Sequence, residues 1–157
     1  MSYFLQPLLR IRVMREDRAA GELTVARRAV AEAELRLEER RHELAEYEET
    51  KEDRRDRRYA AIMGRPVSRE QIDLANEGVA RIDEEGVLKA DNVTRAEGEL
   101  KVKEAAAETA RVNFSAAMKN RMKIEEHKSV WMADEANELE RRTEGELEDF
   151  IVRKPEI

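Results

Sequence analysis

The sequence predicts an all-α protein, a long antiparallel coiled-coil hairpin of two helices. Of its 157 residues, 42% are charged and only 4% are aromatic, so large apolar side chains are too few to fill a globular core. Apolar residues recur at alternating spacings of three and four, which is typical of coiled-coil helices. The one strong break is Gly-Arg-Pro at 64–66. An enzyme-like globule is therefore not expected.

The first helix is expected over residues 6–63. Pro7 suits a first helical turn, where its missing N–H would be unpaired in any case. The coiled-coil seam is Leu23, Ala26, Val30, Ala33, Leu37, Arg40, Leu44 and Tyr47. Seven of these eight positions are apolar, a register that a disordered chain would not keep. After Tyr47 the seam turns polar, although the composition still favours a helix.

A turn is expected over residues 64–68, and a second helical arm over 69–153. Ser68 and Gln71 have the spacing of a capping box, in which side chains satisfy the free amides of a helix start. Gly78, Gly86 and Gly98 each cost about 1 kcal/mol relative to Ala inside a helix. A short extra helix ending near Gly86 is therefore the alternative to one continuous arm.

The second arm carries three apolar stripes. The first is Ile72, Ala75, Val79 and Ile82, the second is Val93, Ala96, Leu100, Ala107, Ala110, Phe114 and Met118, and the third is Met132, Ala136, Leu139, Leu147 and Phe150. The last two do not share one register, so we expect a register shift between Met122 and Trp131. Pro155 is expected to mark a frayed tail.

Charge favours an antiparallel hairpin over a parallel homodimer. Residues 132–150 hold eight acids against two arginines, whereas residues 1–31 hold six arginines against three acids. Opposite ends of the sequence thus attract, which sets orientation more than stability. At 1.5 Å per residue the first helix would be about 85 Å long. A partner of equal length counted back from Arg153 starts near Glu97, which leaves 66–96 over at the hairpin end.

The sequence offers little chemistry. His42 and His127 lie far apart among charged neighbours, as solvated surface histidines do, so no metal site is expected. The chain has no Cys, phosphate-binding loop or nucleophile elbow, so neither cofactor nor catalysis is expected. No apolar run is long enough to cross a membrane. We therefore expect a cytoplasmic protein with no direct membrane insertion.

Three features leave alternatives open. The charged run at 51–59, near the turn, is a solvated helix face, a docking tip or, least favoured because of the net charge of −6, a nucleic-acid site. In the run 8–18, Leu8, Ile11 and Arg15 either belong to the hairpin seam or face a partner. Trp131 either fills the register shift or anchors a partner.

The run Leu-Leu-Arg-Ile-Arg-Val-Met-Arg-Glu-Asp-Arg-Ala at 8–19 resembles the opening of the YscO-like proteins of bacterial type III secretion systems, relatives of the flagellar export protein FliJ. The chain length, the missing Cys and the acidic stretch from Glu138 to Phe150 also fit. The specific part of this resemblance is the first dozen helical residues, and the remainder is similar in pattern only.

The resemblance implies a non-enzymatic stalk. Its terminal end would engage the pore of the hexameric secretion ATPase, and its hairpin end would reach the cytoplasmic ring of the export gate; some members also bind substrate chaperones. The ATPase-facing residues would be Arg10, Arg12, Arg15, Arg18, Glu146, Asp149 and Phe150. By position alone, the gate-facing residues would be Tyr47, Arg54, Arg58 and Tyr59.

Two other classes of function compete with the stalk. A homo-oligomeric coiled-coil scaffold without an ATPase partner predicts a mass of two or more chains in solution. A helical arm that binds nucleic acid or client proteins through the basic turn region predicts salt-dependent binding.

Overall fold

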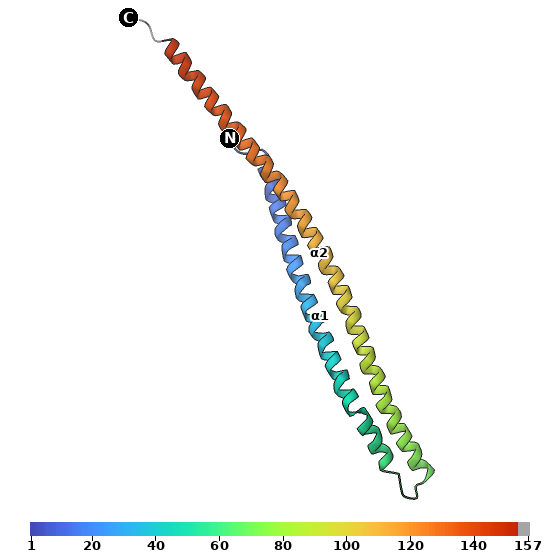
Figure 1. Ribbon diagram of the computed structural model, residues 1–157. Coiled ribbons are helices and arrows are strands. Elements are labelled where there is room, and N and C mark those ends of the chain that lie inside the picture. Colours follow the sequence, from blue (N-terminus) through green and yellow to red (C-terminus); the bar gives the residue numbers. More distant parts are fainter. Residues whose placement is uncertain (154–157) are drawn as a thin grey trace. The chain divides into compact units, whose positions relative to one another are not determined.

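Two long helices make up the computed structural model, which describes residues 1–153 (Figure 1). Helix α1 is Gln6–Ala60 and helix α2 is Arg69–Val152. They pack against each other in antiparallel orientation, and residues 1–153 contain no strand. The predicted all-α hairpin is confirmed. The tail expected at Pro155 lies outside the described residues.

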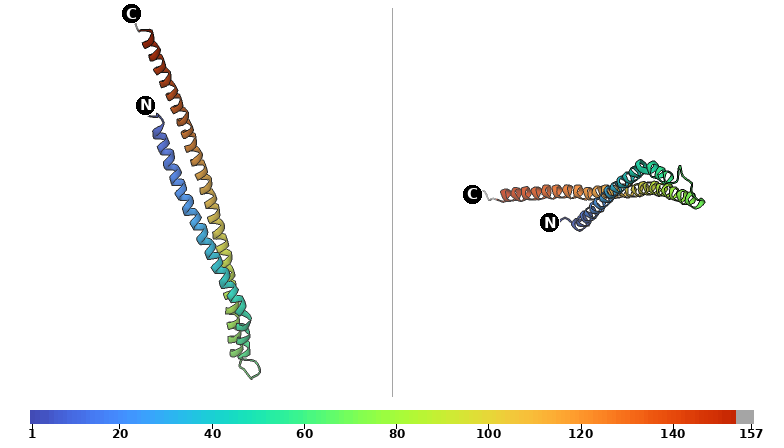
Figure 2. Two further views of the ribbon diagram at one scale, coloured as in Figure 1. Left: turned by 60° about the vertical axis from the view of Figure 1, so that its left-hand side comes forward. Right: turned by 90° about the horizontal axis from the view of Figure 1, so that it is seen from below.

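Helix α1 gives way to a short turn after Ala60, three residues before the expected end at Met63. The amides of Ile62 and Met63 both bond to the carbonyl of Tyr59, at 3.0 Å each. Gly64 has a φ of 77°, a left-handed conformation that favours glycine and reverses the chain. The turn can be followed at the end of the hairpin in the left view of Figure 2.

A reciprocal capping box starts α2, as the spacing of Ser68 and Gln71 predicts. The Gln71 amide donates to Ser68 Oγ at 3.3 Å, and the Ser68 amide donates to Gln71 Oε1 at 2.9 Å. These bonds satisfy two of the amides that a helix start leaves free.

Helix α2 runs without interruption through its glycines, so the alternative of a short extra helix ending near Gly86 is wrong. A Cβ at Gly86 would lie 2.5 Å from the Tyr47 hydroxyl oxygen and 2.6 Å from the ring. Because Gly86 has no side chain, it leaves a hollow on α2 that the Tyr47 ring fills. The packing of this ring offsets the low helix propensity of the glycine.

The two helices divide into two compact units. The turn unit is Thr24–Thr109, and the terminal unit is Met1–Leu23 together with the chain from Ala110. In the turn unit the predicted seam is confirmed at its centre, with Ala33, Leu37, Tyr47, Ala75, Val79, Ile82 and Ala96 all buried. Ile72, at the start of α2, is exposed instead.

The pairing of the helices corrects the expected register of the hairpin. Arg41 meets Glu97 at 3.3 Å, and Arg54 meets Glu85 at 2.8 Å. The first part of α2 thus packs on α1 and is not left over. The surplus of α2 lies at its other end, past Glu135, whose carboxylate lies 3.8 Å from the α-amino group of Met1.

The seam of the terminal unit also differs from expectation. Leu9 and Ala19 are buried, and Arg12 and Glu16 are half-buried, whereas Ile11 and Arg15 are exposed. The face of α1 that packs on α2 therefore follows Leu9, Arg12 and Glu16, each one residue after the expected positions Leu8, Ile11 and Arg15. The cause is that the three/four spacing of the turn unit, counted back from Leu23, continues through these positions.

No register shift interrupts the α2 face of the terminal unit. One three/four spacing of half-buried positions runs from end to end of this face, with Ser115 and Met118 half-buried beside it: Ala110, Phe114, Ala117, Arg121, Ile124, Lys128, Trp131 and Glu135. The expected later stripe, which begins at Met132 and ends at Phe150, is exposed throughout. Because polar residues such as Arg121 and Lys128 occupy part of the seam in the terminal unit, apolar patterning alone predicted the seam at the wrong positions. Within residues 1–153, no helix is both long and apolar enough to span a membrane.

Candidate partner-binding surfaces

An aromatic cluster joins the segment that precedes α1 to α2 in the terminal unit. Tyr3 is buried, its ring lies 5.4 Å from the Trp131 ring, and its hydroxyl forms a 2.7 Å hydrogen bond with His127 Nδ1. Phe4 packs edge-on against both Tyr3 and His127. Trp131 is thus partly a core residue, and His127 is not the freely solvated histidine expected. His42 is solvated, as expected: its side chain is 73% exposed and lies beside Glu46.

Polar seam residues hold the next turns of the terminal unit together. Arg121 is hydrogen-bonded to both Glu16 and Glu125, and the bond to Glu16 raises the pKa of the Arg121 guanidinium. Lys128 Nζ donates to Gln6 Oε1 at 2.9 Å. Apolar periodicity does not reveal these residues. Continuing the heptad count through polar positions would have found them.

The four arginines of the predicted ATPase-facing motif lie on different sides of α1. Arg12 faces α2 and donates to the Asn120 carbonyl at 2.8 Å. Arg10, Arg15 and Arg18 are exposed, and Arg18 pairs with Glu22 of its own helix at 3.2 Å. Three of the four therefore present their charges to solvent, while Arg12 contributes to the pairing of the helices.

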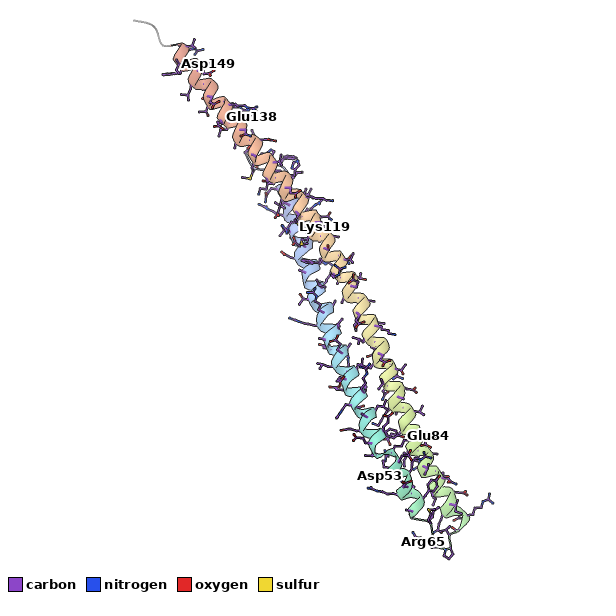
Figure 3. The ribbon with its side chains drawn as sticks, viewed as in Figure 1. Asp53, Arg65, Glu84, Lys119, Glu138 and Asp149 are labelled. Carbon is purple, nitrogen blue, oxygen red and sulfur yellow. The ribbon has the colours of Figure 1, made fainter. Side chains whose placement is uncertain are left out.

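The predicted residues Glu146, Asp149 and Phe150 lie apart from these arginines. All three are exposed on the part of α2 that follows Glu135. In Figure 3, Glu138 and Asp149 lie where no second helix accompanies α2. At 1.5 Å per residue, Asp149 is about 20 Å beyond Glu135 along the helix. One end of the protein thus carries a basic surface on α1 and an acidic single helix on α2.

The predicted gate-facing residues of the turn unit differ in accessibility. Tyr47 is 5% exposed and donates to the Ile82 carbonyl at 2.5 Å, so it serves the hairpin's own core. Arg54 is half-buried, lies 6.0 Å from the Tyr47 ring centroid and binds Glu85. That hydrogen bond lowers the pKa of the Glu85 carboxyl below its ordinary value. Tyr47 is accordingly not proposed as a docking residue.

Arg58 and Tyr59 remain accessible near the turn. The Arg58 side chain lies over Gly78, where a Cβ would be 3.2 Å from its Cδ and Nε atoms, yet Arg58 as a whole is exposed. Tyr59 is 36% exposed and its hydroxyl lies 3.4 Å from Asn76 Oδ1. Arg65, labelled at the turn in Figure 3, is also exposed. These residues form an accessible basic surface.

Residues 1–153 contain no group of three His, Cys, Asp or Glu side chains that could hold a metal ion.

Comparison with known proteins gives two positive findings. The family model described as "Type III secretion protein YscO" matches residues 5–153. The solved structure of CT670 from Chlamydia trachomatis, described as a YscO homolog, matches with a TM-score of 0.75 and 21% sequence identity, covering 96% of this chain and 92% of that one. At that identity the likeness shows a shared fold. A search of curated proteins finds no match.

Proposed function

Because the chain belongs to the YscO family of type III secretion proteins, we propose that it is a non-enzymatic stalk of a secretion apparatus. It couples the hexameric secretion ATPase to the cytoplasmic ring of the export gate and stimulates ATP hydrolysis. The observation that carries this proposal is the unequal length of the helices. Helix α2 runs on past the start of α1 as an exposed single helix, beside which a partner can fit (Figure 1).

The terminal unit supplies the ATPase-facing surface in this proposal. Arg10, Arg15 and Arg18 offer exposed cations on α1, and Glu146, Asp149 and Phe150 offer acidic and apolar side chains on α2. Exposed ion pairs are weak and screened by salt, so contacts of this kind form and break readily. A stalk that engages several ATPase subunits in turn needs such reversible contacts.

The turn unit supplies the gate-facing surface, through Arg58 and Tyr59 with Arg54 at its edge. Arg and Tyr are enriched among the residues that dominate binding energy at interfaces. Tyr47 acts indirectly, because its packing in the Gly86 hollow fixes the helix that carries these side chains. A hairpin of two unequal helices touches the subunits of a six-fold ring unequally. This asymmetry would bias which site hydrolyses ATP.

The ATPase end is tested by neutralising its exposed arginines. The triple variant Arg10→Gln, Arg15→Gln, Arg18→Gln keeps Arg12, whose bond to Asn120 belongs to the hairpin. The matched control, Arg27→Gln, Arg28→Gln, Arg36→Gln, removes the same charge from exposed positions of the turn unit. We expect stimulation of the purified ATPase to fall about tenfold in the first variant only, roughly 1.4 kcal/mol of binding. Equal stimulation by both variants would refute the assignment.

Escort of substrate chaperones is a further part of the proposal, as is a location at the cytoplasmic face of the apparatus. Pull-down from native lysate at low salt should recover the ATPase, the gate protein and any chaperone, because weak charged contacts survive only at low ionic strength. The competing scaffold hypothesis predicts that only copies of the chain are recovered, with a solution mass of two or more chains.

A further inference from the structure

The last part of α2, after Glu135, packs against no other described segment of the chain. All described residues of α2 after Glu135 are exposed, and Figures 1 and 2 agree that this part runs on past the N-terminus. Most helical stability in proteins comes from packing of one face against another element, and single helices are marginal in water. A long unpaired segment is therefore a surface that gains stability when a second helix packs on it.

A groove opens where the pairing with α1 ends. Its apolar floor is Trp131, Met132, Ala136 and Leu139, and Met1 closes one side. The groove has a volume of about 420 Å³. Met132 is 56% exposed and Leu139 is 66% exposed, so large apolar side chains here remain in contact with water. Positions 132, 136 and 139 follow the spacing of one helix face, which is the pattern that receives a helix.

The part of α2 that forms the groove and runs on past it carries an excess of acids. Glu135 and Glu138 line the groove together with Arg142 and Met1; Glu138 pairs with Arg142 at 2.9 Å, and Glu135 lies 3.8 Å from the α-amino group of Met1. From position 136 to 152 the chain carries six acids and two arginines. Two copies of this segment would repel each other, and an anionic lipid surface would also repel the segment. A partner with the opposite charge fits the site best.

The groove also continues an interface that already exists. Trp131 packs against Tyr3, in the segment that precedes α1, at 5.4 Å between ring centroids, and it also lines the groove. A helix placed in the groove would lie along α2 next to the start of α1. The helix pairing of the terminal unit would thereby be extended along α2.

We propose that the groove formed by Trp131, Met132, Ala136 and Leu139 binds a basic amphipathic helix of another protein. Its apolar face covers the floor of the groove, and its Lys or Arg side chains face Glu135 and Glu138. The proposal goes beyond the coupling function, because it concerns residues 131–142 and needs no ATPase.

Trp131 provides a local signal for the test, since it is the only tryptophan of the chain. The probe is a synthetic helix of about 20 residues with leucines on one face and lysines on the other, without aromatic residues. Titration into the full-length protein should give a saturable change in Trp131 fluorescence. A matched peptide with glutamate in place of lysine should bind at least about tenfold more weakly.

Matched variants locate the binding site. Leu139→Ser should weaken binding of the lysine peptide about tenfold, the scale expected for one anchor of a small helix interface. The control is Leu35→Ser on α1, which removes the same side chain at nearly the same exposure, 65% against 66%. The double variant Glu135→Gln, Glu138→Gln should also weaken binding and reduce its salt dependence. Circular dichroism checks that all variants stay helical.

Several outcomes would overturn the proposal. They are the absence of a saturable signal, equal binding of the two peptides, and equal effects of Leu139→Ser and Leu35→Ser. A dimer in sedimentation that dissociates in Leu139→Ser would assign the groove to a second copy instead. Because no ATPase is present, failure here leaves ATPase stimulation by the arginine variants as an independent result.

Discussion

The turn unit and the terminal unit use the same heptad spacing but fill it differently. Five α2 positions of the turn unit are buried: Ala75, Gly78, Val79, Ile82 and Ala96. None of the described α2 residues in the terminal unit is buried, and its seam includes Arg121, Lys128 and Glu135. Apolar burial stabilises at about 25 cal/mol per Å², whereas exposed ion pairs contribute little. The turn unit is therefore held together mainly by apolar burial, whereas polar contacts make up a larger share of the seam in the terminal unit.

The largest effect should come from the buried tyrosine of the turn unit. Tyr47→Ala removes a ring that fills the Gly86 hollow and a hydrogen bond to Ile82, so we expect a loss of about 3 kcal/mol in unfolding free energy. Tyr59→Ala, at a 36% exposed tyrosine, should lose less than about 1 kcal/mol. Urea unfolding followed by circular dichroism measures both. Equal losses would contradict the different burial of the two rings.

The glycines of α2 should respond with opposite signs. Gly86→Ala places a Cβ 2.5 Å from the Tyr47 hydroxyl oxygen, and expelling that ring should cost about 2 kcal/mol despite the better helix propensity of Ala. Gly98 has no atom within 4 Å of the corresponding position, so Gly98→Ala should gain up to about 1 kcal/mol. The same urea experiment compares them. A gain in both variants would show that Tyr47 does not need the hollow.

These glycines also show how far the sequence could predict the structure. The heptad count over Leu23–Tyr47, the Gly64 turn and the Ser68 capping box were local patterns, and the structure contains all three. Gly86 looked like a helix breaker, because propensity is a local quantity and the ring that needs the glycine comes from a residue 39 positions earlier, at Tyr47. Packing overrode propensity there.

The terminal unit was harder to predict for a different reason. Its seam passes through Arg12, Glu16, Arg121 and Lys128, which apolar periodicity ignores, so the apolar pattern points to the exposed stripe that begins at Met132 instead. The exposure of Arg10, Arg15 and Arg18 agrees with a partner-facing surface, whereas Tyr47 is buried, as its place in the heptad count indicates, and does not face a partner. A residue's charge does not tell whether it pairs within the chain or with another protein.

Making the terminal seam apolar should turn it into a tighter interface. Glu16 and Arg121 are 16% and 24% exposed, so both charges are partly desolvated. Replacing such a pair by apolar residues is often neutral or stabilising. We expect Glu16→Leu with Arg121→Leu to raise the amide-exchange protection of residues 6–23 by about 1 kcal/mol and to remove its salt dependence. A drop in protection would mean that the ion pair itself holds this unit together.

The smallest expected effect is a pH dependence in the turn unit. The hydrogen bond from Arg54 lowers the pKa of Glu85, so the folded state binds this proton less readily than the unfolded state. The stabilisation is present above the unfolded pKa of about 4.3 and is lost as the pH falls through the lower folded pKa. Glu85→Gln should therefore flatten the acid limb of stability against pH, measured by urea unfolding at a series of pH values. Glu84→Gln removes a neighbouring exposed carboxylate, labelled in Figure 3, and should leave this limb nearly unchanged. If both variants flatten it equally, net charge and not the Arg54 pair governs the acid unfolding of the turn unit.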